Sequence, residues 1–93
     1  MPKYYPFKIA GYYLYYTTHC TAEAMHAHAG NEELSESTSA KFFICPDGST
    51  RLMRQGSLTD RDVRTIQAFI KIHYLDMYRQ WKLRSVNGFY IGG

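Results

Sequence analysis

The amino-acid sequence predicts an α+β domain in which a small, mainly antiparallel β-sheet of three or four strands packs against one long C-terminal α-helix. Three observations predict this class. Strand-like runs without helical periodicity fill the first part of the chain, Pro46-Asp47-Gly48 separates two of them as a tight hairpin does, and a capped amphipathic segment runs from Thr59 to Arg84. With 93 residues, the chain suffices for one domain and is too short for two.

The chain divides into four successive parts. They are an extended arm (residues 1–7), the sheet (8–55), the helix (59–84) and a tail (85–93). Pro2 and Pro6 exclude regular helix from the arm, whose tyrosines and phenylalanine we expect to lie on the body.

Four segments of the sheet region read as strands. The tyrosine-rich run from Ile9 to Thr18 is the longest, and His26 to Ala29 is a short one. Lys41 to Cys45 and Thr50 to Gln55 form the hairpin. The acidic, serine-rich segment Glu32 to Ser39 is typical of an exposed loop.

The helix has a marked start and a wide apolar surface. Thr59 caps it, Asp62 completes a capping box, and Leu58 staples onto Val63. Apolar residues at three-to-four spacing form the core stripe, which comprises Val63, Ile66, Ile70, His73 or Tyr74, Met77 and Trp81. Three further apolar residues lie beyond this stripe, namely Phe69, Ile72 and Leu75. A small monomer cannot bury all of this surface, which favours a partner or a second copy.

Composition bounds the cellular setting and the partners. The arm lacks the apolar run of a signal peptide and no window approaches a membrane span, so we expect a cytoplasmic protein without membrane contact. The two cysteines are then expected to be free thiols. The net charge of +3 is uneven, because residues 41–93 hold nine Lys/Arg against four aspartates while residues 1–40 hold two lysines against four glutamates.

A short segment, T-T-H-C-T-A-E-A-M-H-A-H-A-G, concentrates three of the four histidines. His19, Cys20, His26 and His28 supply imidazole and thiolate groups, which zinc and similar divalent ions accept as ligands. A metal site is one interpretation. The other is that the histidines of a half-exposed strand are merely hydrogen-bonded or solvated.

The same segment permits a catalytic interpretation. His26 or His28 would act as general base or acid, with Glu23 or Cys20 as companion. Period-two alternation predicts both imidazoles on one face of a short strand, about 6.6 Å apart. We expect this strand beside Tyr12–Tyr16, with His19 approaching from the preceding loop.

Basic side chains on the hairpin and the helix form a candidate surface for nucleic acid or another anion. They are Arg51, Arg54, Arg61 and Arg64, with Lys71 beside them. A solvated surface explains the same charges. His73 likewise has two interpretations, a core histidine with one hydrogen bond or a fourth member of the His26 site.

With strand, H-x-H, hairpin and capped helix in this order, the chain resembles a family of small bacterial proteins known as domain of unknown function 4160. Members typically show a tyrosine-bearing strand, then D-H-x-P-P-H-x-H, a short hairpin and a long helix that ends near a tryptophan. The matching positions are Tyr12 to Tyr16, His19, His26 and His28, Pro46-Asp47-Gly48, and Thr59 to Trp81. Thr18 stands where the family has an acidic residue, and Ala24-Met25 stands where it has two prolines.

The resemblance implies an architecture and a genomic habit rather than an activity, since many members are encoded beside another small protein in a toxin–antitoxin-like pair. Two functions follow as hypotheses. The first is a protein-binding component of such a pair, which binds its neighbour or forms a homodimer. The second is a small hydrolase or ribonuclease-like enzyme that uses His26 and His28 on a phosphodiester, with or without a metal.

Overall fold

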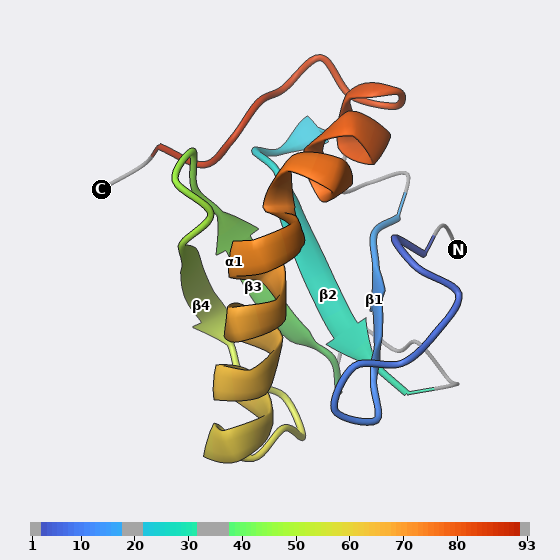
Figure 1. The fold of residues 1–93 in the computed structure, drawn as a ribbon, viewed down its shortest axis with the longest axis vertical. Coiled ribbons are helices and arrows are strands. Elements are labelled where there is room, and N and C mark those ends of the chain that lie inside the picture. Colours follow the sequence, from blue (N-terminus) through green and yellow to red (C-terminus); the bar gives the residue numbers. More distant parts are fainter. Residues whose placement is uncertain (1–2, 18–21, 32–37, 92–93) are drawn as a thin grey trace.

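The computed structural model describes residues 3–17, 22–31 and 38–91, and it has one helix packed on one four-stranded sheet within these ranges (Figure 1). In chain order the elements are β1 (Tyr13–Tyr15), β2 (His26–Gly30), β3 (Ala40–Ile44), β4 (Thr50–Arg54) and α1 (Asp60–Lys82). The fold is therefore α+β, as the sequence predicts.

The sheet is an antiparallel meander in the order β1-β2-β3-β4. Each strand pairs with the next one along the chain, and the register shifts between Lys41 and Phe42, where β4 has one extra residue. The predicted hairpin is confirmed, because Cys45 donates a backbone hydrogen bond of 2.9 Å to Ser49 across the turn.

The two faces of the sheet have different neighbours. One face of the sheet lies against α1, and we call it the near face. Its apolar side chains join the buried stripe of α1 in one core. The strand residues of this core are Leu14, Ala27, Ala29, Phe42 and Ile44. Because side chains alternate along a strand, the residues between them lie on the opposite side, which we call the far face. The far face comprises Tyr13, Tyr15, His26, His28, Lys41, Phe43, Arg51 and Arg54.

The predicted capping box starts the helix. The Thr59 side chain accepts a hydrogen bond from the backbone of Asp62, whose carboxylate accepts one from the backbone of Thr59. At the other end, α1 stops at Lys82 rather than at Arg84. Leu83 is its C-cap, and the indole of Trp81 donates a hydrogen bond of 2.9 Å to the carbonyl of Asn87 as the chain turns away.

The prediction of a strand from Ile9 to Thr18 was too long. Positive φ angles of 55° at Ala10 and 85° at Gly11 turn the chain, and Ile9 and Tyr12 exchange two backbone hydrogen bonds of 2.7 and 3.0 Å across that turn. A tight turn therefore replaces the first half of the strand, and of the described residues 9–17 only Tyr13–Tyr15 belong to a strand of the sheet. The arm passes β1 instead, where Tyr4 donates a backbone hydrogen bond of 2.9 Å to Leu14.

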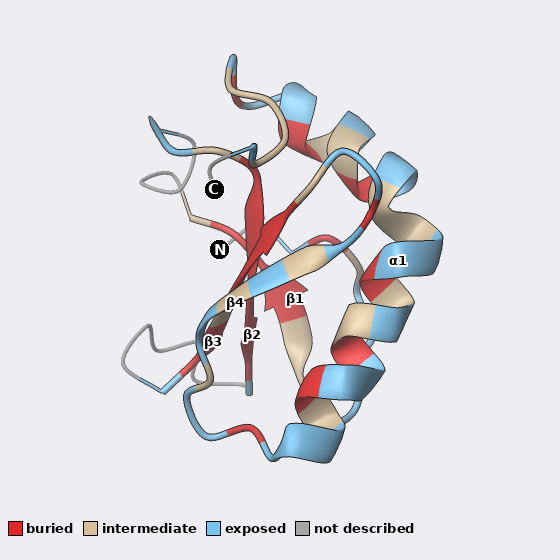
Figure 2. Cartoon of the chain, turned by 90° about the vertical axis from the view of Figure 1, so that its left-hand side faces the viewer, coloured by how far each residue is buried: buried red, intermediate tan, exposed pale blue. Residues whose placement is uncertain are grey.

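The tail crosses the ends of β2 and β3. Met25 donates a backbone hydrogen bond to Gly88, and Tyr90 donates one to Ile44. Two stacked ring pairs hold the tail, with Tyr90 on Phe43 at 4.3 Å and Phe89 on Tyr78 at 4.1 Å. Most of β2 and β3 is consequently buried, while β4 is mainly exposed (Figure 2).

Candidate functional site

His26 and His28 lie side by side on the far face of β2. Their ring centroids are 5.2 Å apart, and His28 is paired with Tyr15 of β1. The predicted placement of the pair on one face beside the tyrosine strand is thus confirmed. His19 and Cys20, the other two predicted ligands, lie outside the described residues.

An aromatic wall surrounds the two imidazoles. Tyr15 stacks on His28 at 5.2 Å, and the rings of Phe43 and Trp81 lie 5.4 and 5.6 Å from that of His26. His26 is 0% exposed and His28 is 3% exposed. The interpretation that places hydrogen-bonded or solvated histidines on a half-exposed strand is wrong about the exposure, because both rings are enclosed.

The enclosure keeps His28 neutral. Burial lowers its pKa to about 4, and electrostatic interactions with His26, Lys41 and Arg54 act in the same direction. A neutral imidazole at pH 7 can accept a hydrogen bond or coordinate a metal, but it is a poor general acid.

Glu23 brings a carboxylate to the same cluster. Its Oε2 lies 3.8 Å from Nε2 of His26. The same oxygen accepts a hydrogen bond of 3.0 Å from Nζ of Lys41. The hydrogen bond from Lys41 lowers the pKa of Glu23, so the carboxylate is charged at neutral pH. The other ring nitrogen of His26, Nδ1, is 2.8 Å from the carbonyl oxygen of Ala24. The carbonyl of Ala24 thus orients the His26 ring, and the Glu23 carboxylate lies near its other nitrogen but beyond hydrogen-bond distance.

The predicted metal ligands extend beyond the described residues. Residues 3–17, 22–31 and 38–91 contain no group of three or more His, Cys, Asp or Glu side chains arranged to hold a metal ion. The predicted set needs His19 and Cys20, which are not among them. His73 has different neighbours, because its ring lies against Phe69 at 4.3 Å.

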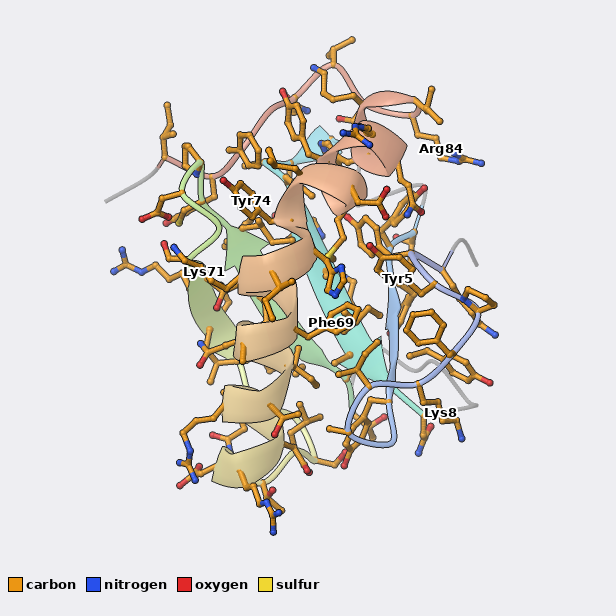
Figure 3. All side chains as sticks on the ribbon, in the orientation of Figure 1. Tyr5, Lys8, Phe69, Lys71, Tyr74 and Arg84 are labelled. Carbon is orange, nitrogen blue, oxygen red and sulfur yellow. The ribbon has the colours of Figure 1, made fainter. Side chains whose placement is uncertain are left out.

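The four arginines proposed for anion contact occupy two separate surfaces. Arg51 and Arg54 belong to the far face, where Arg54 donates a hydrogen bond of 3.0 Å to the carbonyl of Ser39. Arg61 and Arg64 are exposed on the first turns of α1, which covers the opposite side of the sheet. Lys71 donates a hydrogen bond of 2.7 Å to the carbonyl of Asp47 and so ties α1 to the hairpin (Figure 3).

A second candidate site is apolar and lies on the outside of α1. We call it the outer patch and define it by Phe7, Phe69, Ile72 and Leu75. Ile72 is 76% exposed, Leu75 is 55% exposed and Phe7 is 51% exposed. The three helix residues follow one another at spacings of three, so their side chains are neighbours on the surface.

The arm completes the outer patch. Tyr5 stacks on Phe7 at 5.2 Å and meets the edge of Phe69 at 5.5 Å, and Phe7 lies 6.3 Å from Phe69. Figure 3 shows Tyr5 and Phe69 between the helix and the N-terminal segment. The sequence predicts the surplus helix residues but not their junction with Phe7, because no local pattern links segments so far apart in the chain.

Within the described residues, no helix combines the length and the apolar character that are needed to cross a membrane.

Comparison with known families places these features in context. Residues 11–82 match the model described as Domain of unknown function (DUF4160), and the chain belongs to this family. The match runs from the turn before β1 to the end of α1, so it includes the histidine pair and the three helix residues of the outer patch. No curated protein and no solved structure matches the chain.

Proposed function

We propose that this protein is a cytoplasmic, bacterial protein-binding component of a toxin–antitoxin-like pair, and that the outer patch binds the partner encoded beside it. The observation that carries the proposal is the exposure of Ile72 and Leu75, two large aliphatic side chains in the middle of the outer surface of α1. Scattered surface apolar residues need no explanation, but a contiguous group flanked by aromatic rings is typical of an interface core.

The surroundings of the patch support the same function. Phe7 and Phe69 add aromatic area at one side, and Asp76 and Arg79 add charges within one turn of Leu75. An apolar centre with a charged rim is the usual anatomy of a protein interface. The arm is held against the helix, so little of the binding surface needs to be ordered when a partner arrives.

Co-purification tests the proposal. The chain and the product of the adjacent gene are co-expressed with a tag on one of them, and Ile72→Glu is compared with Val86→Glu. Val86 is 93% exposed and lies after α1, so it is a matched control in which the same charge replaces an exposed aliphatic residue. We expect wild type and Val86→Glu to retain the partner and Ile72→Glu to lose it, because a carboxylate would be buried at the interface.

Two other results would redirect the proposal. Sedimentation of the chain alone that shows a dimer dissociated by Ile72→Glu would assign the patch to a second copy of the chain. Equal partner recovery with Ile72→Glu and wild type would remove the patch as the binding site.

A second candidate function is that of a His-dependent hydrolase or ribonuclease-like enzyme acting on phosphodiesters. The separation of 5.2 Å between the ring centroids of His26 and His28 favours this function, since two imidazoles at this distance can both contact one phosphate group. With zinc or another divalent ion, His19 and Cys20 would join them as ligands. The enclosed position of both rings weighs against it.

Elemental analysis of untagged protein and a nuclease assay test this second function. If the protein has this second function, we expect the untagged protein to contain stoichiometric metal or to cleave phosphodiesters. His26→Ala and His28→Ala should lose that property. Cleavage that persists in both variants would exclude the histidine pair.

A further inference from the structure

β4 is the outermost strand of the sheet, and one side of its backbone faces outward. The strand order ends at β4. In Figure 2, β4 is the strand nearest the viewer, and no labelled element lies in front of it. Its residues are exposed or half-buried throughout, with Met53 53% exposed. Such an edge can accept a further strand by main-chain hydrogen bonds.

The register identifies the outward-facing backbone groups. Cys45, directly after β3, donates its N–H to Ser49, directly before β4, and inward-bonded residues recur at every second position of an antiparallel pair. The backbone of Arg51 is therefore hydrogen-bonded to β3, while the N–H and C=O groups of Thr50 and Leu52 point away from β3. No hydrogen bond within the described part of the chain takes up these outward groups.

The side chains of the edge carry one sign of charge. The strand T-R-L-M-R has two arginines and no acidic residue. Arg51 pairs with Phe43 and Arg54 with Lys41, and the extra residue at the register shift puts both arginines on the far face. A strand added beside β4 would thus place its far-face side chains next to two guanidinium groups.

We propose that the outer edge of β4 binds an extended, acidic peptide segment of a partner protein, which becomes a fifth strand of the sheet. Main-chain bonds to Thr50 and Leu52 supply the register, and carboxylates at alternate positions pair with Arg51 and Arg54. The inference concerns a surface distinct from the outer patch and does not depend on the function proposed above.

Charge excludes the simplest competitor, which is a second copy of the chain. Antiparallel pairing of β4 with its own copy would bring four arginines onto one face of two adjacent strands, and like charges across strands are destabilising. The arginines therefore protect the edge from self-pairing while they leave it open to a strand of opposite charge.

The backbone distinguishes a peptide from nucleic acid. Phosphates can pair with Arg51 and Arg54, but the outward carbonyls of Thr50 and Leu52 have no donor to meet in a phosphate chain and would repel it. A peptide strand supplies both donors and acceptors at the required alternation.

Nuclear magnetic resonance titration of the full chain tests the proposal. The probe is a peptide of about nine residues in which valine or threonine alternates with glutamate, and its control has lysine in place of glutamate. We expect the acidic peptide to shift the amide signals of Thr50 and Leu52 and to slow their hydrogen exchange, with an affinity that falls as salt is added. The lysine peptide should shift neither.

Two variants separate backbone pairing from charge. Thr50→Pro removes an outward N–H that the β3–β4 ladder does not use, and it should abolish binding in protein whose remaining spectrum is unchanged. Arg51→Glu should weaken binding at least about tenfold, whereas Arg64→Glu, with the same change of net charge on α1, should change it less than about twofold.

Three outcomes would overturn the inference. They are signal shifts confined to side chains away from Thr50 and Leu52, equal affinity for the lysine peptide, and a short single-stranded oligonucleotide that binds the edge in preference to the acidic peptide. Self-association of the wild-type chain through β4 would equally replace the peptide with a second copy. Ile72→Glu should leave peptide binding intact, so failure here is distinguishable from failure of the outer patch.

Discussion

The phenol of Tyr5 donates a hydrogen bond of 2.6 Å to Oδ2 of Asp76, a residue 71 positions further along the chain. This bond fastens the N-terminal arm to the middle of α1 and holds Phe7 beside Phe69. The outer patch therefore combines residues of the N-terminal arm with residues of α1. Its aromatic half depends on a contact that has no local sequence signal.

Removal of the Tyr5 hydroxyl should loosen the arm. Tyr5→Phe keeps the ring and loses the bond to Asp76, so we expect the free energy of unfolding to fall by about 0.5–1.5 kcal/mol. Tyr13→Phe is the matched control, because the Tyr13 hydroxyl makes no hydrogen bond within the described residues. Urea denaturation measures both, and an equal effect of the two substitutions would contradict the role of the Tyr5–Asp76 bond.

The same contact predicts a loss of stability at alkaline pH. Burial raises the pKa of Tyr5 above its usual value, and the hydrogen bond to Asp76 and the charge of that carboxylate raise it further. Between the unfolded pKa of about 10 and the higher folded pKa, only the unfolded chain loses this proton, so stability falls as pH rises. Denaturation at successive pH values should show a shallower decline above pH 10 in Tyr5→Phe than in wild type. Parallel declines would mean that Tyr5 ionises alike in both states.

His28 predicts the opposite pH dependence. Its folded pKa of about 4 lies below the ordinary value of 6.5, so between these values the unfolded chain binds a proton that the folded chain does not. Stability is fully present above pH 6.5 and should fall by roughly 1–3 kcal/mol between pH 7 and pH 4. His28→Phe, which keeps a ring against Tyr15, should flatten this part of the profile. An unaltered profile in His28→Phe would show that another group titrates.

The hairpin turn offers a controlled test of packing against α1. Gly48 has a φ of 84°, and a Cβ atom there would lie 2.5 Å from Cδ1 of Tyr74. Gly11 has a φ of 85° and would place its Cβ with no heavy atom within 4 Å. Gly11→Ala therefore measures the backbone cost alone, about 1 kcal/mol, and Gly48→Ala should cost about 1–3 kcal/mol more. Equal losses in thermal denaturation would mean that Tyr74 moves aside freely.

Sequence patterns predicted the elements whose signals are local. The capping box of Thr59 and Asp62, the Pro46-Asp47-Gly48 hairpin and the alternation of His26 and His28 each depend on neighbours within a few residues, and the structure has all three. The family assignment followed from their order and is confirmed by the match over residues 11–82.

Features set by distant contacts were not predictable in the same way. The run from Ile9 to Thr18 reads as a strand by composition, yet a turn at Ala10 and Gly11 folds its first half back. One interpretation placed the histidine pair on a half-exposed strand, because the sequence does not reveal that Trp81 and Phe43 enclose it. Composition reports which residues favour an interior, but only the tertiary fold decides which ones reach it.

The most direct test of the central claim, that the outer patch binds a protein partner, is isothermal titration of the chain with the product of its adjacent gene at several temperatures. We expect a one-to-one complex with a negative heat-capacity change, since apolar surface at Ile72 and Leu75 would be buried. Ile72→Glu should weaken the complex at least about a hundredfold, which corresponds to about 2.7 kcal/mol, and Val86→Glu should match wild type. Absence of binding by the wild-type chain, or equal affinities for Ile72→Glu and wild type, would contradict the claim.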